Sequence, residues 1–97
     1  MDINQIKRKL EEKKTYLRDS FYVKEIGIFG SIIRGEEVYQ SDIDMLVEFE
    51  REHKDFFNYF RLKYYLEDLL KRKVDLVIKE AVKPRLKEKI LREVEYV

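Results

Sequence analysis

The sequence feature that most constrains the fold is a short glycine-bounded turn between two apolar runs. The turn spans residues 30–35, after the run Val23–Phe29 and before the run Ile43–Phe49. Both runs carry the bulky side chains that favour strands, and a glycine ends the first run. Ten residues separate Ser31 in the turn from Asp42 at the start of the second run. The pattern predicts two strands that hold the turn beside acidic side chains.

Composition excludes several classes of protein. The 97 residues suffice for a single domain, 1–97, and a hydrophobic content of 44% allows a packed core. Charged residues make up 42% of the chain at a formal net charge of +1, so we expect no direct nucleic-acid binding. There is no cysteine, no apolar run near the ~18 residues of a membrane span, and no signal peptide. We therefore expect a cytoplasmic protein without disulfides or membrane contact.

The periodicity of apolar residues predicts elements in the order α-β-α-β-α-β-α. This order is typical of an α/β (α+β) domain, here with a small mixed β-sheet packed against helices. Gly27, inside the first strand, indicates that backbone or ligand comes close to it. Helices are expected over residues 3–20, 31–34, 56–70 and 83–95, and strands over residues 23–29, 43–49 and 74–78.

Two of these helices carry apolar stripes at helical spacing. Such a stripe usually faces the core, so we expect both to be buried. For the helix over residues 56–70, contact with a partner protein is the alternative. Its stripe consists of Phe56, Phe57, Phe60, Tyr64, Leu69 and Leu70, with Leu66 flanking it. The stripe of the last helix consists of Leu86, Ile90, Leu91 and Val94.

Three aspartates are the candidate catalytic and metal-binding residues. Asp42 and Asp44 lie on one face of the second strand, roughly 6–7 Å apart by strand rise. Asp75 is the one acid in the apolar strand over residues 74–78, where a charge is costly unless it is paired or binds metal. Carboxylates held together repel unless a cation joins them, and Mg²⁺ takes carboxylate and phosphate oxygens together. The alternative is structural, because aspartate often caps a turn at a strand start.

The turn supplies candidate residues for binding an anion. Gly30 and Ser31 follow the first strand, and Ser31 is expected to open a helical turn whose N–H groups could hold a phosphate. Arg34 lies one turn further on and could donate to the same anion. The alternatives are that Ser31 only caps the helix and that Arg34 only pairs with Glu36 or Glu37. Asp75 could likewise pair with Lys73 or Arg72.

These motifs resemble a known superfamily. Gly30-Ser31, followed ten residues later by Asp42-x-Asp44, resembles the signature of the DNA polymerase β-like nucleotidyltransferases. The wider match looks like the minimal nucleotidyltransferases, known as MNT or MntA-like proteins. Ile33 departs from the pattern, because relatives commonly carry a small residue before the arginine; this makes the base preference less certain. The match extends over residues 29–35, 41–47, 74–77, 84–86 and 90–93.

The resemblance implies a fold, a reaction and roles for the candidate residues. The fold would be the nucleotidyltransferase core. Asp42 and Asp44 would bind two Mg²⁺ ions, and Asp75 would hold one of them and help to deprotonate the attacking hydroxyl. Gly30 and Ser31 would contact the β and γ phosphates of ATP, assisted by Arg34. The reaction would transfer a nucleoside monophosphate to a hydroxyl and release pyrophosphate.

The resemblance also implies a partner. MNT proteins act as antitoxins beside a HEPN-domain ribonuclease toxin, to which they transfer AMP from ATP, on a tyrosine. A hetero-oligomer with such a toxin is the first hypothesis. The alternatives are a non-catalytic antitoxin that neutralises its partner by binding, and a nucleotidyltransferase acting on a small molecule or an RNA end. The acceptor residue, the number of AMP units and the stoichiometry stay open.

Overall fold

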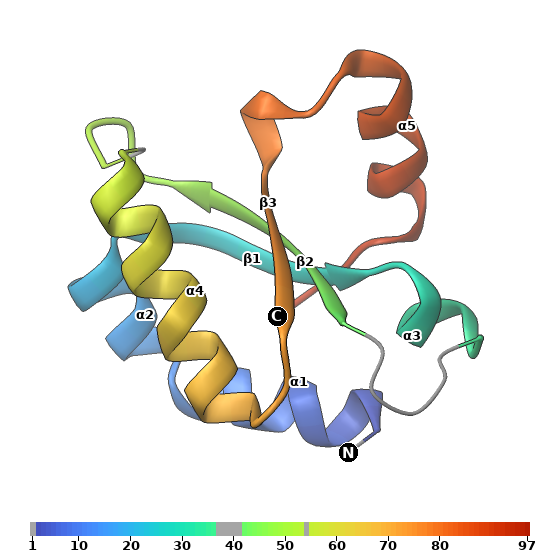
Figure 1. Ribbon diagram of the computed structural model, residues 1–97, viewed down its shortest axis with the longest axis horizontal. Helices are drawn as coiled ribbons and strands as arrows, with labels where there is room; N and C mark the ends of the chain where they lie inside the picture. Colours follow the sequence, from blue (N-terminus) through green and yellow to red (C-terminus); the bar gives the residue numbers. More distant parts are fainter. Residues whose placement is uncertain (1, 37–41, 54) are drawn as a thin grey trace.

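A four-stranded mixed sheet forms the centre of the computed structural model (Figure 1), which describes residues 2–36, 42–53 and 55–97. The strand order is β3-β2-β1-β4. β1 pairs antiparallel with β2 and with β4, whereas β2 and β3 are parallel. The sheet and the helices that pack on it confirm the predicted α/β (α+β) class. The strands are β1 (Val23–Phe29), β2 (Ile43–Phe49), β3 (Val74–Ile78) and β4 (Glu95–Tyr96).

Helices follow the predicted order, with one break. The expected single helix over residues 3–20 is wrong, because the chain leaves helical geometry at Lys13, whose N–H bonds the Leu10 carbonyl at 3.1 Å. Among the described residues, no helix is long and apolar enough to cross a membrane. The helices are α1 (Ile3–Glu12), α2 (Lys14–Phe21), α3 (Ser31–Arg34), α4 (Phe56–Leu70) and α5 (Pro84–Glu93), with a 3₁₀ turn, η1, at Lys79–Ala81.

The main core lies between one face of the sheet and helices α1, α2 and α4 (Figure 1). Alternate residues of β2 point into it, as the period of two in that strand predicts. The break at Lys13 lets α1 and α2 contribute separately to this core. The most deeply buried contributors include Ile6, Leu10, Leu17, Ile28, Ile43, Met45, Val47, Leu62, Leu66 and Leu70. The opposite face of the sheet is left for Asp44 and Asp75 and is approached by α5.

The stripe predicted for α4 is divided between surface and core: its aromatic members lie outside the core, contrary to the prediction, whereas Leu66 and Leu70 are buried and Leu69 is half-buried. Phe56, Phe57 and Tyr64 are 80%, 84% and 62% exposed, and Phe60 is 42% exposed. The buried row lies on the opposite side of the helix, at a spacing of four residues. One side of α4 is aromatic and the other is mainly aliphatic. The aliphatic side, which has the smaller side chains, packs on the sheet. The buried row consists of Asn58, Leu62, Leu66 and Leu70.

The stripe predicted for the last helix is also largely wrong. Of its members, Ile90 is buried, whereas Leu86 and Leu91 are 55% and 40% exposed. The helix ends at Glu93, and the chain continues as β4, a strand that sequence periodicity did not predict. Val94 is half-buried beyond the end of the helix.

β4 explains the glycine inside β1. A Cβ atom on Gly27 would lie 2.7 Å from Cγ2 of Val94 and 3.1 Å from the carbonyl oxygen of Glu95. The predicted close approach of backbone to Gly27 is therefore confirmed. The Val97 N–H also donates to the Ile26 carbonyl at 2.9 Å, which holds the end of the chain against β1.

Candidate active site

The turn after β1 depends on Gly30 for two physical reasons. Gly30 has φ +83° and ψ −152°, a region that is essentially restricted to glycine. A Cβ atom there would lie 2.0 Å from Oδ2 of Asp44, so the carboxylate occupies the space that a side chain would need. The turn thus leads directly from β1 into α3 while lying against an acid of the neighbouring strand.

Ser31 begins the short helix and does not cap it. The N-cap residue is Gly30, whose carbonyl accepts the N–H groups of Ile33 and Arg34 at 3.1 and 3.2 Å. Gly35 ends the helix with φ +71°. The alternative in which Ser31 serves as an N-cap is therefore not what the structure shows. Gln40 and Ser41, part of the sequence motif, lie outside the described residues.

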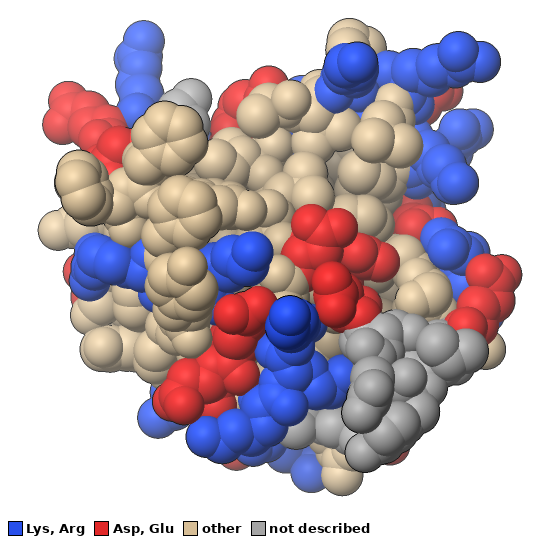
Figure 2. Space-filling model, viewed as in Figure 1, with Lys and Arg blue, Asp and Glu red and all other residues tan. Residues whose placement is uncertain are grey.

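Asp44 and Asp75 lie opposite each other in the parallel pair of strands β2 and β3. Asp44 is half-buried, and burial is the main cause that raises the pKa of its carboxyl. The charge of Asp75, a hydrogen bond with Asp75 and the charge of Asp42 raise that pKa further. The three aspartates therefore act on one another, and acidic side chains gather over β2 in Figure 2.

The described residues do not already form a metal-binding cluster. No three acidic, histidine or cysteine side chains among residues 2–36, 42–53 and 55–97 are arranged as ligands of one ion. Asp42 and Asp75 are exposed, whereas Asp44 is half-buried. The site therefore consists of the partly desolvated carboxyl of Asp44 and two exposed carboxylates, those of Asp42 and Asp75.

Arg34 is held between two carboxylates. Its Nε donates to Oε2 of Glu36 at 3.0 Å, and its Nη1 donates to both carboxylate oxygens of Glu93, at 3.0 and 3.1 Å. The hydrogen bonds to Glu36 and Glu93 raise the pKa of the Arg34 guanidinium. Pairing with Glu36 was the structural alternative to anion binding, and it exists. The charge of Arg34 also lowers the pKa of Asp44, so the guanidinium acts on the acidic group as well.

Glu93 is a site residue that sequence reasoning missed. It lies in the last turn of α5, and its Oε1 also accepts the Gly30 N–H at 2.8 Å. The residue spacing in α5 carried a usable signal. Residues three or four positions apart lie on one face of a helix, and one such face of α5 lies toward the site. That side carries Leu86, Lys89, Ile90 and Glu93.

One cavity joins these groups. It has a volume of about 240 Å³ and collects residues from β1, α3, β2, β3 and α5. Four of the six predicted site residues line it, whereas Ser31 and Asp42 do not. The lining residues are Phe29, Gly30, Arg34, Asp44, Asp75, Val77, Leu86, Lys89, Ile90 and Glu93.

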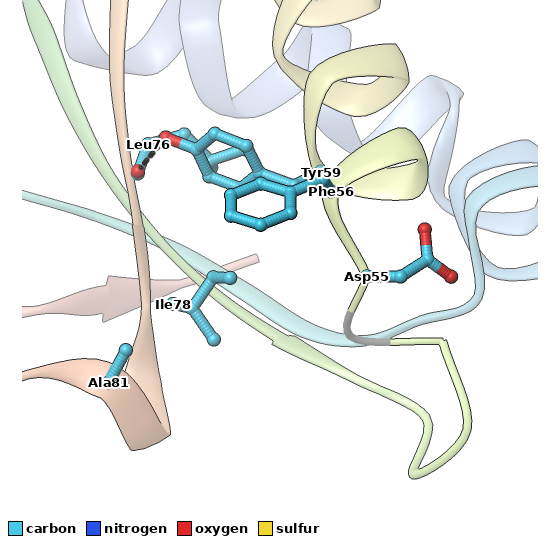
Figure 3. Close-up of a pocket in the computed structure, with 6 residues that line it drawn as sticks. All are labelled: Asp55, Phe56, Tyr59, Leu76, Ile78 and Ala81. Carbon is cyan, nitrogen blue, oxygen red and sulfur yellow. Dashed lines mark hydrogen bonds between the residues drawn. The ribbon is translucent and has the colours of Figure 1, made fainter.

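A larger cavity, of about 470 Å³, lies between the start of α4 and the end of β3 (Figure 3). Its walls are mainly apolar, and its one carboxylate, Asp55, accepts the Asn58 N–H at 2.8 Å as the cap of α4. The Tyr59 hydroxyl donates to the Leu76 carbonyl at 2.6 Å. The three predicted aspartates are absent from its lining, so the smaller cavity is the candidate active site.

The mixed sheet with acids on adjacent strands beside a glycine turn is typical of enzymes that transfer nucleotidyl groups. The chain belongs to the Nucleotidyltransferase domain family, whose profile matches residues 4–97. It is 43% identical over 97 residues to the protein adenylyltransferase MntA of Thermococcus cleftensis, covering 100% of this chain and 97% of that protein. The chain is therefore a nucleotidyltransferase, as the sequence motifs predicted.

Solved structures show the same relationship. A structure assigned to the minimal nucleotidyltransferases superposes with a TM-score of 0.83 at 37% identity, covering 98% of this chain and 95% of that one. A crystal structure of a toxin–antitoxin with AMP-PNP superposes with a TM-score of 0.71 at 25% identity, covering 89% of this chain and 70% of that one. The predicted resemblance to the minimal nucleotidyltransferases is confirmed.

Proposed function

We propose that this chain is an antitoxin that transfers AMP from ATP to a hydroxyl group of a HEPN-domain toxin, on a tyrosine. The observation that carries the proposal is the pairing of Asp44 with Asp75 in adjacent strands, against the Gly30 turn. The names of two similar proteins support the transfer of AMP to a protein and the antitoxin role. One is a protein adenylyltransferase, and the other is a toxin–antitoxin solved with a non-hydrolysable ATP analogue.

The donor set fits Mg²⁺. Asp44 is desolvated and repelled by two other carboxylates, so a divalent cation would relieve the condition that raises its pKa. In the proposal, Asp42, Asp44 and Asp75 hold the metal. When bound, two Mg²⁺ ions neutralise phosphate charge and favour ionisation of the attacking hydroxyl.

Gly30, Ser31 and Arg34 would bind the triphosphate. The Gly30 N–H already donates to Glu93, so we assign to Gly30 the role of letting phosphate approach the backbone closely. Arg34 would supply a charge-assisted donor through Nη2, because its bonds to the two glutamates among the described residues come from Nε and Nη1. Ser31 would contribute its hydroxyl at the start of α3.

The proposed reaction is a displacement at the α-phosphorus of ATP. The acceptor hydroxyl oxygen forms a bond to this phosphorus, and the bond to the bridging oxygen of the β-phosphate breaks. Pyrophosphate leaves, and the hydroxyl proton passes to the carboxylate of Asp75. A partner protein brings the acceptor, so the working form is a hetero-oligomer in the cytoplasm.

The test uses the proposed HEPN-domain partner, together with ATP and Mg²⁺. We expect mass spectrometry of the toxin to show increments of one or more AMP units. The control is the protein with Asp42→Ala and Asp44→Ala. Absence of increments with the wild type, or persistence of them with the double variant, would refute the proposal.

A second candidate function is neutralisation by binding alone. The exposed aromatic side chains of α4 favour it, because Phe56 and Phe57 are 80% and 84% exposed. The double aspartate variant separates the two functions in cells that express the toxin. Loss of protection supports catalysis, whereas full protection supports binding. Transfer to a small molecule or an RNA end is the outcome if nucleotide is consumed without modification of the toxin.

A further inference from the structure

We propose that Glu93 is a positioning residue, which orients Arg34 and the Gly30 turn for binding of the nucleotide phosphates. The inference rests on the proposed function, in which Arg34 contacts the triphosphate. Glu93 itself would not touch the reacting atoms. It would act by holding the guanidinium and the backbone of the turn in a fixed relationship.

One carboxylate joins the two ends of the turn. Oε1 of Glu93 accepts the Gly30 N–H at 2.8 Å, and both oxygens accept from Nη1 of Arg34, at 3.0 and 3.1 Å. The Glu93 side chain is 20% exposed. A carboxylate that is mostly removed from water is costly unless charged or polar partners satisfy it, and this one has both kinds. The contact bridges segments that are 63 and 59 residues apart in the chain.

These bonds define the orientation of Arg34. Glu36 accepts from Nε and Glu93 accepts from Nη1, so two carboxylates on different segments determine the plane of the guanidinium. Within the part of the chain that the structure describes, these bonds do not involve Nη2, which can donate to an anion. The side chain of Glu36 is 61% exposed, against 20% for Glu93, so water screens its ion pair with Arg34 more strongly.

The backbone around Glu93 is itself held. The Val94 N–H donates to the Ile90 carbonyl at 2.9 Å, and Glu95 then pairs with Ile28 in the sheet. Glu95 also forms an ion pair with Lys7 of α1. The carboxylate that contacts Arg34 therefore extends from a residue between a helix end and a paired strand. Support of this kind is what keeps a binding group in place before the ligand arrives.

A different role for Glu93 predicts the opposite change in nucleotide affinity when its carboxylate is removed. The carboxylate could occupy the anion site and compete with phosphate, in which case its removal would tighten binding of ATP. A positioning role predicts that removal weakens binding. The bonds to Nε and Nη1 favour positioning, because among the described residues they do not involve Nη2, whose N–H groups can donate to a phosphate.

The experiment measures the Kd of AMP-PNP with Mg²⁺ by calorimetry on the full chain. We expect Glu93→Ala to raise the Kd about tenfold, the size of effect that one lost charge-assisted contact produces. Glu93→Gln retains an acceptor for the Gly30 N–H and should raise the Kd less. Glu88→Ala, at an exposed position of the same helix, is the matched control and should leave the Kd unchanged.

Coupling to Arg34 distinguishes positioning from support of the fold. We expect Glu93→Ala to weaken binding less in the Arg34→Ala background than in the wild type, because the contact with the guanidinium is already gone and only the bond to the Gly30 N–H is left to lose. Additive losses, an unchanged Kd or a tighter Kd for the Glu93 variants would overturn the inference. If Glu93→Ala does not fold, Glu93→Gln decides the same question.

The Arg34 and Glu93 variants also separate the positioning role of Glu93 from the proposed phosphate role of Arg34. If Arg34→Ala weakens AMP-PNP binding and the Glu93 variants do not, the positioning role fails and the phosphate role of Arg34 stands. If Arg34→Ala leaves the Kd unchanged, the proposed phosphate role of Arg34 fails, and the positioning of Arg34 by Glu93 fails with it.

Discussion

The carboxylate of Asp44 occupies the space beside Gly30 in which any other residue would place its Cβ atom, 2.0 Å from Oδ2. An acid of β2 and the turn after β1 are thus packed together without a side chain between them. This contact links the two halves of the sequence motif, and it explains why the turn begins with glycine.

Gly30→Ala is expected to destabilise the protein by about 3 kcal/mol or more, because the left-handed backbone strain and the clash with Asp44 add to each other. Thermal unfolding measures this change. Gly35→Ala is the matched control, with φ +71° and nothing within 4 Å of the added Cβ. It should cost only about 1–2 kcal/mol. Equal losses in the two variants would contradict the proposed contact.

Asp44→Asn is expected to raise the melting temperature of the ligand-free protein near pH 7. Burial, Asp75 and Asp42 raise the pKa of Asp44 in the folded state, so the folded state favours the protonated carboxyl. This preference stabilises the wild type below the ordinary pKa of 3.8 and is lost as the pH rises through the folded pKa. The variant should therefore be more stable than the wild type at neutral pH and have no such advantage in stability below about pH 4.

Melting curves of the wild type and Asp44→Asn across this pH range test the prediction. The variant should also lose nucleotidyl transfer, since the proposed metal ligand is gone. A variant that is less stable than the wild type at pH 7 would show that the carboxyl is not repelled by its neighbours. Asp19→Asn, at an exposed position away from the three acids, is the control.

Phe57→Ser is expected to leave the melting temperature of the isolated chain within a few degrees of the wild type, because the ring is 84% exposed. If α4 contacts the partner, the same variant should weaken the complex with the HEPN protein about tenfold or more. Leu62→Ala, on the buried side of the same helix, should instead cost about 2–5 kcal/mol of stability. Unchanged affinity for the partner would exclude Phe57 from the interface.

Gly27→Ala is expected to destabilise the protein by about 1–3 kcal/mol, because the added Cβ would lie 2.7 Å from Cγ2 of Val94. Val94→Ala in the same chain removes that atom and should recover part of the loss. Thermal unfolding of the single and double variants measures the recovery. No recovery would locate the conflict at the backbone of β4, where the Glu95 carbonyl lies 3.1 Å from the added Cβ.

The strands and the acids could be predicted because their signals are local. Alternation in β2 assigns Met45 to the core and Asp44 to the opposite face, whatever surrounds the strand. Sequence periodicity does not say which strands pair, and the structure supplies the pairing of β2 with β3, which places Asp44 opposite Asp75. The resemblance to the minimal nucleotidyltransferases rests on these same local motifs.

Other features depended on packing between distant segments. The sequence by itself determined the turn at Gly30 and the faces of β2 and β3, because each follows from neighbours along the chain, and its resemblance to a known family gave the class of enzyme. Only the tertiary structure decided which apolar side of α4 is buried, since both sides can pack and the sheet accepts one. It also decided that Glu93 meets Gly30 and Arg34, because no local pattern connects a helix end to a turn 63 residues away.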